Sequence, residues 1–137
     1  MTASSRTVEH VGEWRVELRG DTLPEIFEEL ALIIARAAGP AALSQGPEEE
    51  LDVKARDPTG LLVDYANELV GRSEIERRAY DDLREIEIHE QGAPRIRARN
   101  RGRPVKSWRS PLKAATYHGA SLSRDAECWR ASILFDV

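Results

Sequence analysis

Residues 13–37, EWRVELRGDTLPEIFEELALIIARA, join a strand pattern to a helix pattern and set the fold class. From Glu13 to Arg19, apolar and charged side chains alternate, and this period of two predicts a strand with one buried face. Thr22 then offers a helix cap, and Glu25 is placed to reach back as in a capping box. Apolar residues follow at helical spacing until Gly39-Pro40, which predicts the end of a core helix.

The same order recurs once and then changes. Alternation over residues 51–56 predicts a second strand, and residues 61–70 carry the apolar stripe of a second helix. Four strand patterns follow without a helix, at residues 80–89, 95–101, 113–122 and 129–135. This order predicts an α+β fold: a mixed or mostly antiparallel sheet of about six strands, with two main helices packed on one side. The last four strands are expected to pair as a meander.

Length and composition indicate one domain over residues 1–137, with residues 1–7 as a flexible tail. No apolar run reaches the roughly 20 residues of a bilayer span, and the first residues lack the apolar core of a signal peptide. A single cysteine, Cys128, excludes an internal disulfide framework. We therefore expect a reduced, cytoplasmic setting.

The charge is divided unevenly along the chain. Residues 1–90 hold 21 acidic and 10 basic residues, a balance of -11, whereas residues 91–137 hold 3 and 10, a balance of +7. The two sum to the net charge of -4. Such asymmetry indicates either an acidic partner, such as nucleic acid, or two halves that pack together and neutralise each other.

A row of arginines carries much of this positive charge. It alternates with apolar residues on one strand pattern and is followed by a basic loop with one tryptophan: Arg95, Arg97, Arg99, Arg101, Arg103 and Trp108. Guanidinium groups beside an aromatic ring are typical of surfaces that contact RNA phosphates and stack on bases. A solvated strand face, with salt bridges to the acidic half, explains the same pattern.

The last third of the chain holds the other polar groups of interest. Asp136 and Val137 place carboxylate and carbonyl oxygens at one chain end, and clusters of such oxygens bind hard cations. A solvated, frayed end is the alternative. Period two places Lys113 and Tyr117 on one strand face and His118 on the other, unless a bulge at Gly119 re-aims it.

Several segments, in order along nearly the whole chain, resemble the archease family. Residues 9–13, Glu-His-Val-Gly-Glu, lie where the family has His-Thr-Ala-Asp, and residues 20–27 resemble its Gly-Asp-Ser-Leu helix entry. Residues 61–69, LLVDYANEL, are similar to its Leu-Leu-Val-Asp-Trp-Leu-Asn-Glu-Leu helix. Residues 113–119, KAATYHG, resemble Lys-Ala-Val-Thr-Tyr-His-Gly, and Asp136-Val137 resembles the family's Leu-Asp-Val terminus.

The resemblance implies a non-enzymatic accessory protein. Archeases activate the GTP-dependent ligase that joins RNA with 3′-phosphate or 2′,3′-cyclic phosphate ends in tRNA splicing and RNA repair, by promoting guanylylation and multiple turnover. They bind a divalent cation, usually assigned as Ca²⁺. Carried over, its ligands are Glu13, Asp136 and Val137. The residues expected to face the ligase are His10, Lys113, Tyr117 and His118.

Departures from the family pattern leave a second function open. The motif's Thr, Ala and Asp are Val11, Gly12 and Glu13, and the extra methylene of glutamate shifts its oxygens by about one bond length, which matters at coordination distances of roughly 2.3–2.6 Å. The alternative is an RNA-binding or scaffolding module that has lost metal dependence. A metal-dependent hydrolase has less support, because carboxylates without a positioned base or nucleophile define no reaction.

Overall fold

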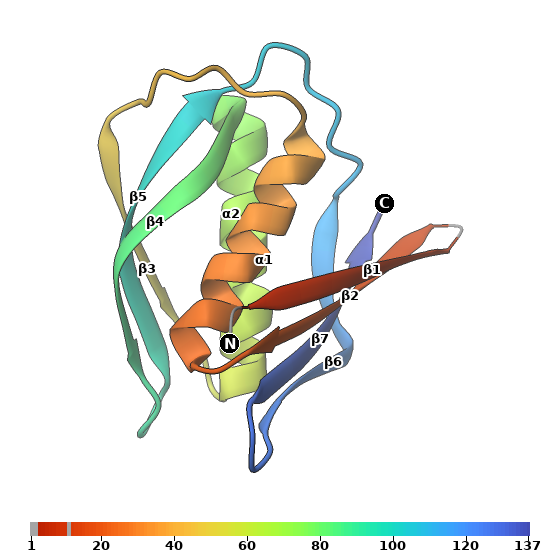
Figure 1. The fold of residues 1–137 in the computed structure, drawn as a ribbon, viewed down its shortest axis with the longest axis vertical. Helices are drawn as coiled ribbons and strands as arrows, with labels where there is room; N and C mark the ends of the chain where they lie inside the picture. Colours follow the sequence, from red (N-terminus) through yellow and green to blue (C-terminus); the bar gives the residue numbers. More distant parts are fainter. Residues whose placement is uncertain (1–2, 11) are drawn as a thin grey trace.

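The computed structural model describes residues 3–10 and 12–137, and its elements form three layers (Figure 1). Two helices lie between a four-stranded sheet and a three-stranded sheet, and every described strand pairing is antiparallel. The predicted α+β class is confirmed. Instead of one sheet of about six strands covered on one side, seven strands form two sheets that enclose the helices.

The strand order explains how the expected meander is divided. The elements are β1 (Ser4–His10), β2 (Glu13–Gly20), α1 (Leu23–Ala38), β3 (Glu48–Lys54), α2 (Pro58–Glu76), β4 (Arg78–His89), β5 (Arg95–Pro104), β6 (Ala114–Arg124) and β7 (Trp129–Asp136). The larger sheet has the order β1-β2-β7-β6, and the smaller has the order β3-β5-β4. The last four strands therefore form two hairpins in different sheets, β4–β5 and β6–β7, because residues 105–113 carry the chain from one sheet to the other.

Most of the segment expected to be a tail is a strand. β1 pairs with β2 along its whole length, from Ser4 opposite Arg19 to His10 opposite Glu13. Residues 4–7 of β1 are exposed, so backbone pairing holds this strand in place more than burial does. An apolar alternation cannot reveal such a strand. Residues 1–2 and 11 lie outside the described part of the chain.

The start of α1 has the predicted cap chemistry. The Glu25 amide donates to Thr22 Oγ1 at 3.4 Å, and Glu25 Oε1 accepts from the Asp21 amide at 3.0 Å. The helix ends before Gly39, whose φ of +113° is a conformation that favours glycine. The apolar stripe of α1 packs on β4 and on β2 of the opposite sheet, so this helix helps to join the layers.

Helix α2 contacts both sheets. Four consecutive residues, 60–63, are buried, because α2 contacts α1, β6 and all three strands of the smaller sheet. The Tyr65 hydroxyl donates to the Phe27 carbonyl at 2.5 Å, and the two rings meet edge to face at 4.9 Å. Even so, within the described residues we find no helix with the length and apolar composition of a bilayer span.

Candidate functional site

Two predicted ligands lie side by side at one end of the four-stranded sheet. Glu13 on β2 is directly opposite Asp136 on β7, and both side chains are exposed. His10 on β1 is opposite Glu13, and Ala114 on β6 is opposite Asp136, so the row crosses all four strands. The His10 side chain lies outside the described part of the structure. The register therefore brings together chain segments that are 123 residues apart (136 − 13).

The kind of pairing brings the two carboxylates close. The Val137 amide donates to the Gly12 carbonyl at 3.1 Å, and pairs of antiparallel strands alternate between hydrogen-bonded and narrower, non-hydrogen-bonded positions. Glu13 and Asp136, the next pair along, therefore occupy a narrow position, with a Cα separation of about 4.5 Å. Like charges directly opposite each other are destabilising, and a cation between them would relieve this repulsion.

The donor set at this position fits a hard cation. Glu13 and Asp136 supply carboxylate oxygens, and Val137 supplies main-chain oxygens held beside them by the bond to Gly12. The Lys113 amide donates to the Asp136 carbonyl at 2.9 Å, which ties a third segment to this end of the sheet. Among the described residues, no group of three His, Cys, Asp or Glu side chains is placed to hold a metal, so a main-chain oxygen would have to complete the set.

A bulge in β6 carries the next group of predicted residues. From Thr116 to Ser121 the chain advances five residues, while its partner β7 retreats only two, from Leu134 to Ser132. The segment between them holds Tyr117, His118 and Gly119, and Gly119 has a φ of +70°. The bulge that the sequence allowed at Gly119 is present, and it leaves Tyr117 and His118 exposed. Lys113, also exposed, comes just before β6.

Helix α2 fixes this bulged strand through two polar residues that sequence reasoning did not single out. Asn67 Nδ2 donates to the Ala115 carbonyl at 3.0 Å, and the Ala115 amide donates to Asn67 Oδ1 at 2.8 Å. One turn earlier, Asp64 Oδ1 accepts from the Tyr117 hydroxyl, and this hydrogen bond raises the pKa of Tyr117. The two segments with the closest resemblance to archease are therefore joined directly. The available signal was the resemblance of residues 61–69, which include both Asp64 and Asn67, to the archease helix.

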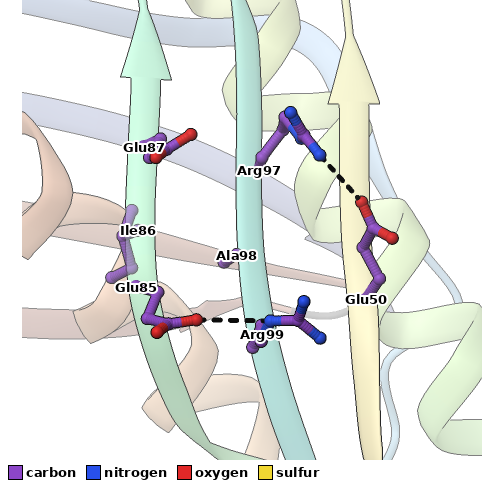
Figure 2. A pocket seen from close by; sticks show the side chains of 7 residues that line it. All are labelled: Glu50, Glu85, Ile86, Glu87, Arg97, Ala98 and Arg99. Atoms are coloured by element: carbon purple, nitrogen blue, oxygen red, sulfur yellow. Dashed lines mark hydrogen bonds and ion pairs between the residues drawn. The ribbon is translucent and has the colours of Figure 1, made fainter.

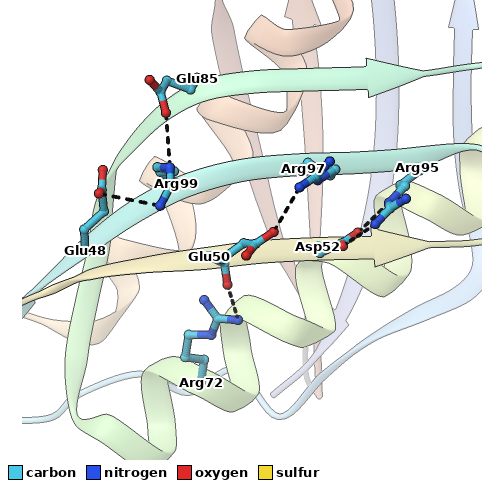
Figure 3. A network of polar contacts seen from close by, with 8 residues as sticks. All are labelled: Glu48, Glu50, Asp52, Arg72, Glu85, Arg95, Arg97 and Arg99. Carbon is cyan, nitrogen blue, oxygen red and sulfur yellow. Dashed lines mark hydrogen bonds and ion pairs between the residues drawn. The ribbon is translucent and has the colours of Figure 1, made fainter.

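The arginine row lies on the outer face of the three-stranded sheet, where acids face it. Arg95 pairs with Asp52 at 2.5 Å, Arg97 with Glu50 at 3.4 Å, and Arg99 with Glu48 and Glu85 at 3.7 and 3.2 Å (Figure 3). A shallow pocket between these strands is lined by the same charges, as Figure 2 shows for Glu50, Glu85, Arg97 and Arg99. The ion pairs that the salt-bridge explanation requires are present.

The remaining members of the row also have partners within the chain. Arg101 Nη1 donates to the Gly46 carbonyl at 3.2 Å, and Arg103 forms an ion pair with Asp81. The guanidinium carbon of Arg77 lies 4.9 Å from the centre of the Trp108 ring, on the face that a base would need for stacking. Contact of these residues with nucleic acid stays a prediction. It would require phosphates and bases to displace the acids, the Gly46 carbonyl and Arg77 from the arginines and Trp108.

The chain has clear relatives among known proteins. Residues 6–137 match the model of the Archease protein family (MTH1598/TM1083). The chain is 26% identical to protein archease of Methanosarcina barkeri over 136 residues, which cover 95% of this chain and 93% of the relative. It is 31% identical to protein archease of Methanopyrus kandleri over 97 residues, which cover 66% and 69%.

Two solved structures share the fold. Protein 1598 of Methanobacterium thermoautotrophicum, solved in solution, has a TM-score of 0.78 at 19% identity, covering 97% of this chain and 98% of that one. The crystal structure of a Thermotoga maritima archease, described as a possible chaperone, has a TM-score of 0.68 at 20% identity and covers 96% of each chain. At these identities the two structures establish the fold alone.

Proposed function

The chain belongs to the archease family, and on that premise we propose that it is a non-enzymatic accessory protein of a GTP-dependent 3′-phosphate RNA ligase. In this role it promotes guanylylation of the ligase and multiple turnover in tRNA splicing and RNA repair. The observation that carries the proposal is the register of Glu13 with Asp136, because it assembles the family's ligand positions from opposite ends of the chain. We place this activity in the cytoplasm, where an unpaired cysteine such as Cys128 is the norm.

We further propose that Glu13, Asp136 and Val137 hold a divalent cation, with Ca²⁺ favoured by the all-oxygen donor set. The bound ion supplies positive charge that cancels the repulsion between the two carboxylates. The chain itself does the positioning: the amides of Val137 and Lys113 fix the end of β7 against its neighbours. Glutamate in place of the family's aspartate reaches farther, which the open, exposed end of the sheet can accommodate.

The surface next to this site is our candidate for contact with the ligase. It combines Lys113, Tyr117 and His118, all exposed and at the β6 edge, with His10 on β1, the other edge strand of the same sheet. The Asp64–Tyr117 and Asn67–Ala115 bonds hold the bulge on α2, so this surface is supported by a buried helix. A rigid support reduces the entropy lost on docking.

The test is multiple-turnover ligation of 3′-phosphate RNA by the ligase from the same source, with this protein at substoichiometric amounts. We expect stimulation by the wild-type chain and its loss with Asp136→Asn. Glu127→Gln is the matched control, because Glu127 is exposed and its side chain makes no hydrogen bond or ion pair within the described structure. Unchanged turnover with the wild-type chain would refute the activator role.

The alternative is an RNA-binding or scaffolding module without metal dependence. The arginine row that motivated it is ion-paired with acids of β3 and β4, so that row gives the alternative less support than its sequence did. It predicts stimulation of ligation that persists in EDTA and in Asp136→Asn.

A further inference from the structure

A second like-charge pair lies at the opposite end of the same two strands. Arg19 on β2 is directly opposite Arg130 on β7, and the row continues to Ser4 on β1 and Ser123 on β6. Arg19 is six residues from Glu13, which is about 20 Å along a strand. The outer face of the four-stranded sheet therefore has two acids at one end and two arginines at the other.

The two arginines occupy the same narrow kind of position as the two acids. The β2–β7 register has no shift, and hydrogen-bonded and non-hydrogen-bonded pairs alternate along it. Arg19 is an even number of residues from Glu13, so its pair with Arg130 is also non-hydrogen-bonded. Their side chains point to one face at the closest cross-strand spacing, where like charges destabilise the sheet. An anion held between them would reverse that effect.

Only one of the two arginines has a carboxylate partner. Arg130 Nε donates to Asp125 Oδ2 at 2.9 Å, and Asp125 Oδ1 is itself held by the amides of Glu127 and Cys128. This arrangement lowers the pKa of Asp125, chiefly through the bond from Arg130, and it orients the Arg130 guanidinium. For Arg19, none of the described carboxylates lies within ion-pair distance, and its Nε is buried without a hydrogen-bond acceptor. Such an unpaired donor costs free energy.

These groups line a shallow pocket on the sheet. Its lining includes Ser4, Arg6, Arg19 and Arg130, together with one acid, Glu17. Glu17 is shared between Arg6 at 3.6 Å and Arg15 at 3.9 Å, so Asp125, the partner of Arg130, is the one described carboxylate that pairs with either Arg19 or Arg130. This arginine pocket differs from the row on β5, where each of Arg95, Arg97 and Arg99 forms an ion pair with an acid on a neighbouring strand, because Arg19 forms none with the described carboxylates.

We propose that the arginine pocket binds phosphate groups of an RNA chain. Guanidinium groups bind phosphate in bidentate fashion, and serine hydroxyls commonly contact the phosphate backbone. The Ser4–Arg19–Arg130–Ser123 row crosses four strands, or about 14 Å at the usual strand spacing, which is wider than one phosphate and suits a chain of them. This goes beyond the proposed activator role and requires neither the cation nor the ligase.

The test is binding of a short fluorescein-labelled single-stranded RNA, measured by anisotropy in EDTA and without ligase over a range of salt. We expect the double variant Arg19→Gln, Arg130→Gln to bind about tenfold more weakly or worse, and its log-log salt slope to be shallower by about 1.4, since each lost phosphate contact in a single strand contributes about 0.7. Arg95→Gln, Arg97→Gln is the matched control, with the same charge change, and should retain binding within about twofold.

Two further measurements keep the outcomes distinct. Thermal melts of both double variants establish that each is folded before binding is compared. The Nε–H signal of Arg19 in ¹⁵N spectra is then titrated with the RNA and, separately, with inorganic phosphate. The two titrations are compared at equal concentrations of phosphate groups. Saturation of the Arg19 shift at a lower concentration with RNA than with inorganic phosphate supports the RNA site. Saturation at the same concentration with both reassigns the pocket to free phosphate. Unchanged RNA affinity in the Arg19, Arg130 variant overturns the proposal, whether or not the protein stimulates the ligase.

Discussion

The outer faces of the two sheets arrange their charges differently. On the three-stranded sheet, arginines of β5 lie between acids of β3 and β4 and form ion pairs with them (Figure 3). These pairs run diagonally between strands, because the residue directly opposite Arg95 on β3 is Lys54 and the one opposite Arg99 on β4 is Arg84. On the four-stranded sheet, β2 and β7 place acid opposite acid at Glu13 and Asp136, and arginine opposite arginine at Arg19 and Arg130. A charged face that is already compensated stabilises the fold modestly, whereas an uncompensated one is where we expect ligands.

The first way to break this comparison is to remove one acid of the like-charge pair. At Ca²⁺ of about 100 times its dissociation constant, we expect the unfolding free energy of the wild-type chain to rise by about 2.7 kcal/mol, and that of Asp136→Asn not to rise. Urea melts with EDTA and with Ca²⁺ measure both. Asp52→Asn, in the compensated sheet, should keep the full increase. A calcium-dependent increase that survives in Asp136→Asn would remove the acidic pair from the site.

The attachment of α2 to the two sheets provides the next contrast. Asn67→Ala removes both bonds to the Ala115 backbone of the four-stranded sheet and should cost about 1–3 kcal/mol, because a buried strand segment loses its partners. Glu68→Gln, one residue on, weakens only the exposed Arg72 pair and should cost less than about 0.5 kcal/mol. Urea unfolding compares them. Equal costs would show that Asn67 does not hold the bulge.

Replacing a glutamate by glutamine should change the unfolding free energy in opposite directions on the two outer faces. In EDTA at low salt, Glu13→Gln removes a repulsion and should stabilise the chain by about 0.2–1 kcal/mol. Glu50→Gln removes the pair with Arg97 and should destabilise it by a similar amount. Both effects should shrink at high salt. Chemical denaturation of the two variants checks this, and a shared sign would contradict the contrast between the sheets.

Acid should weaken an ion pair of the compensated face. The hydrogen bond from Arg95 lowers the pKa of Asp52 from its usual 3.8, so the folded protein binds this proton less readily than the unfolded chain does. The stability it contributes is complete above pH 3.8 and is lost as the pH falls through the lower, folded value. The difference in unfolding free energy between wild type and Asp52→Asn should therefore be constant near neutral pH and shrink below pH 3.8. A constant difference down to pH 2.5 would exclude this linkage.

An element of the fold could be predicted from the sequence where a local periodic pattern determines it. The β2 strand and both helices followed from alternation, helical spacing and the cap at Thr22, which are local. The division into two sheets did not follow, because a period of two identifies the buried face of a strand and leaves its neighbour undetermined. β1 was missed because it has little apolar alternation, although it pairs fully with β2.

The candidate site was predictable in part from side-chain chemistry and in part from a resemblance. Asp136 and Val137 were named from their oxygen atoms, Glu13 was added from the family motif, and the structure adds the register of Glu13 with Asp136. Asp64 and Asn67 were placed on the polar side of a helix, which a pattern assigns to water, whereas in this fold that side meets the β6 backbone and Tyr117. The Arg19–Arg130 pair could not be foreseen, because it requires a pairing across 111 residues (130 − 19).

The central position of β7 also governs the order in which the molecule can be built. β2 is made before the other strands of its sheet except β1, and its partner β7 is made after β3 to β6, so during synthesis the β1–β2 hairpin has a free edge until residues 129–136 have left the ribosome. The β3–β5–β4 sheet needs only residues 48–104 and can assemble sooner. Closing a loop of more than 100 residues is slow, so the larger sheet should complete folding late and be the region most exposed to misassembly on the way.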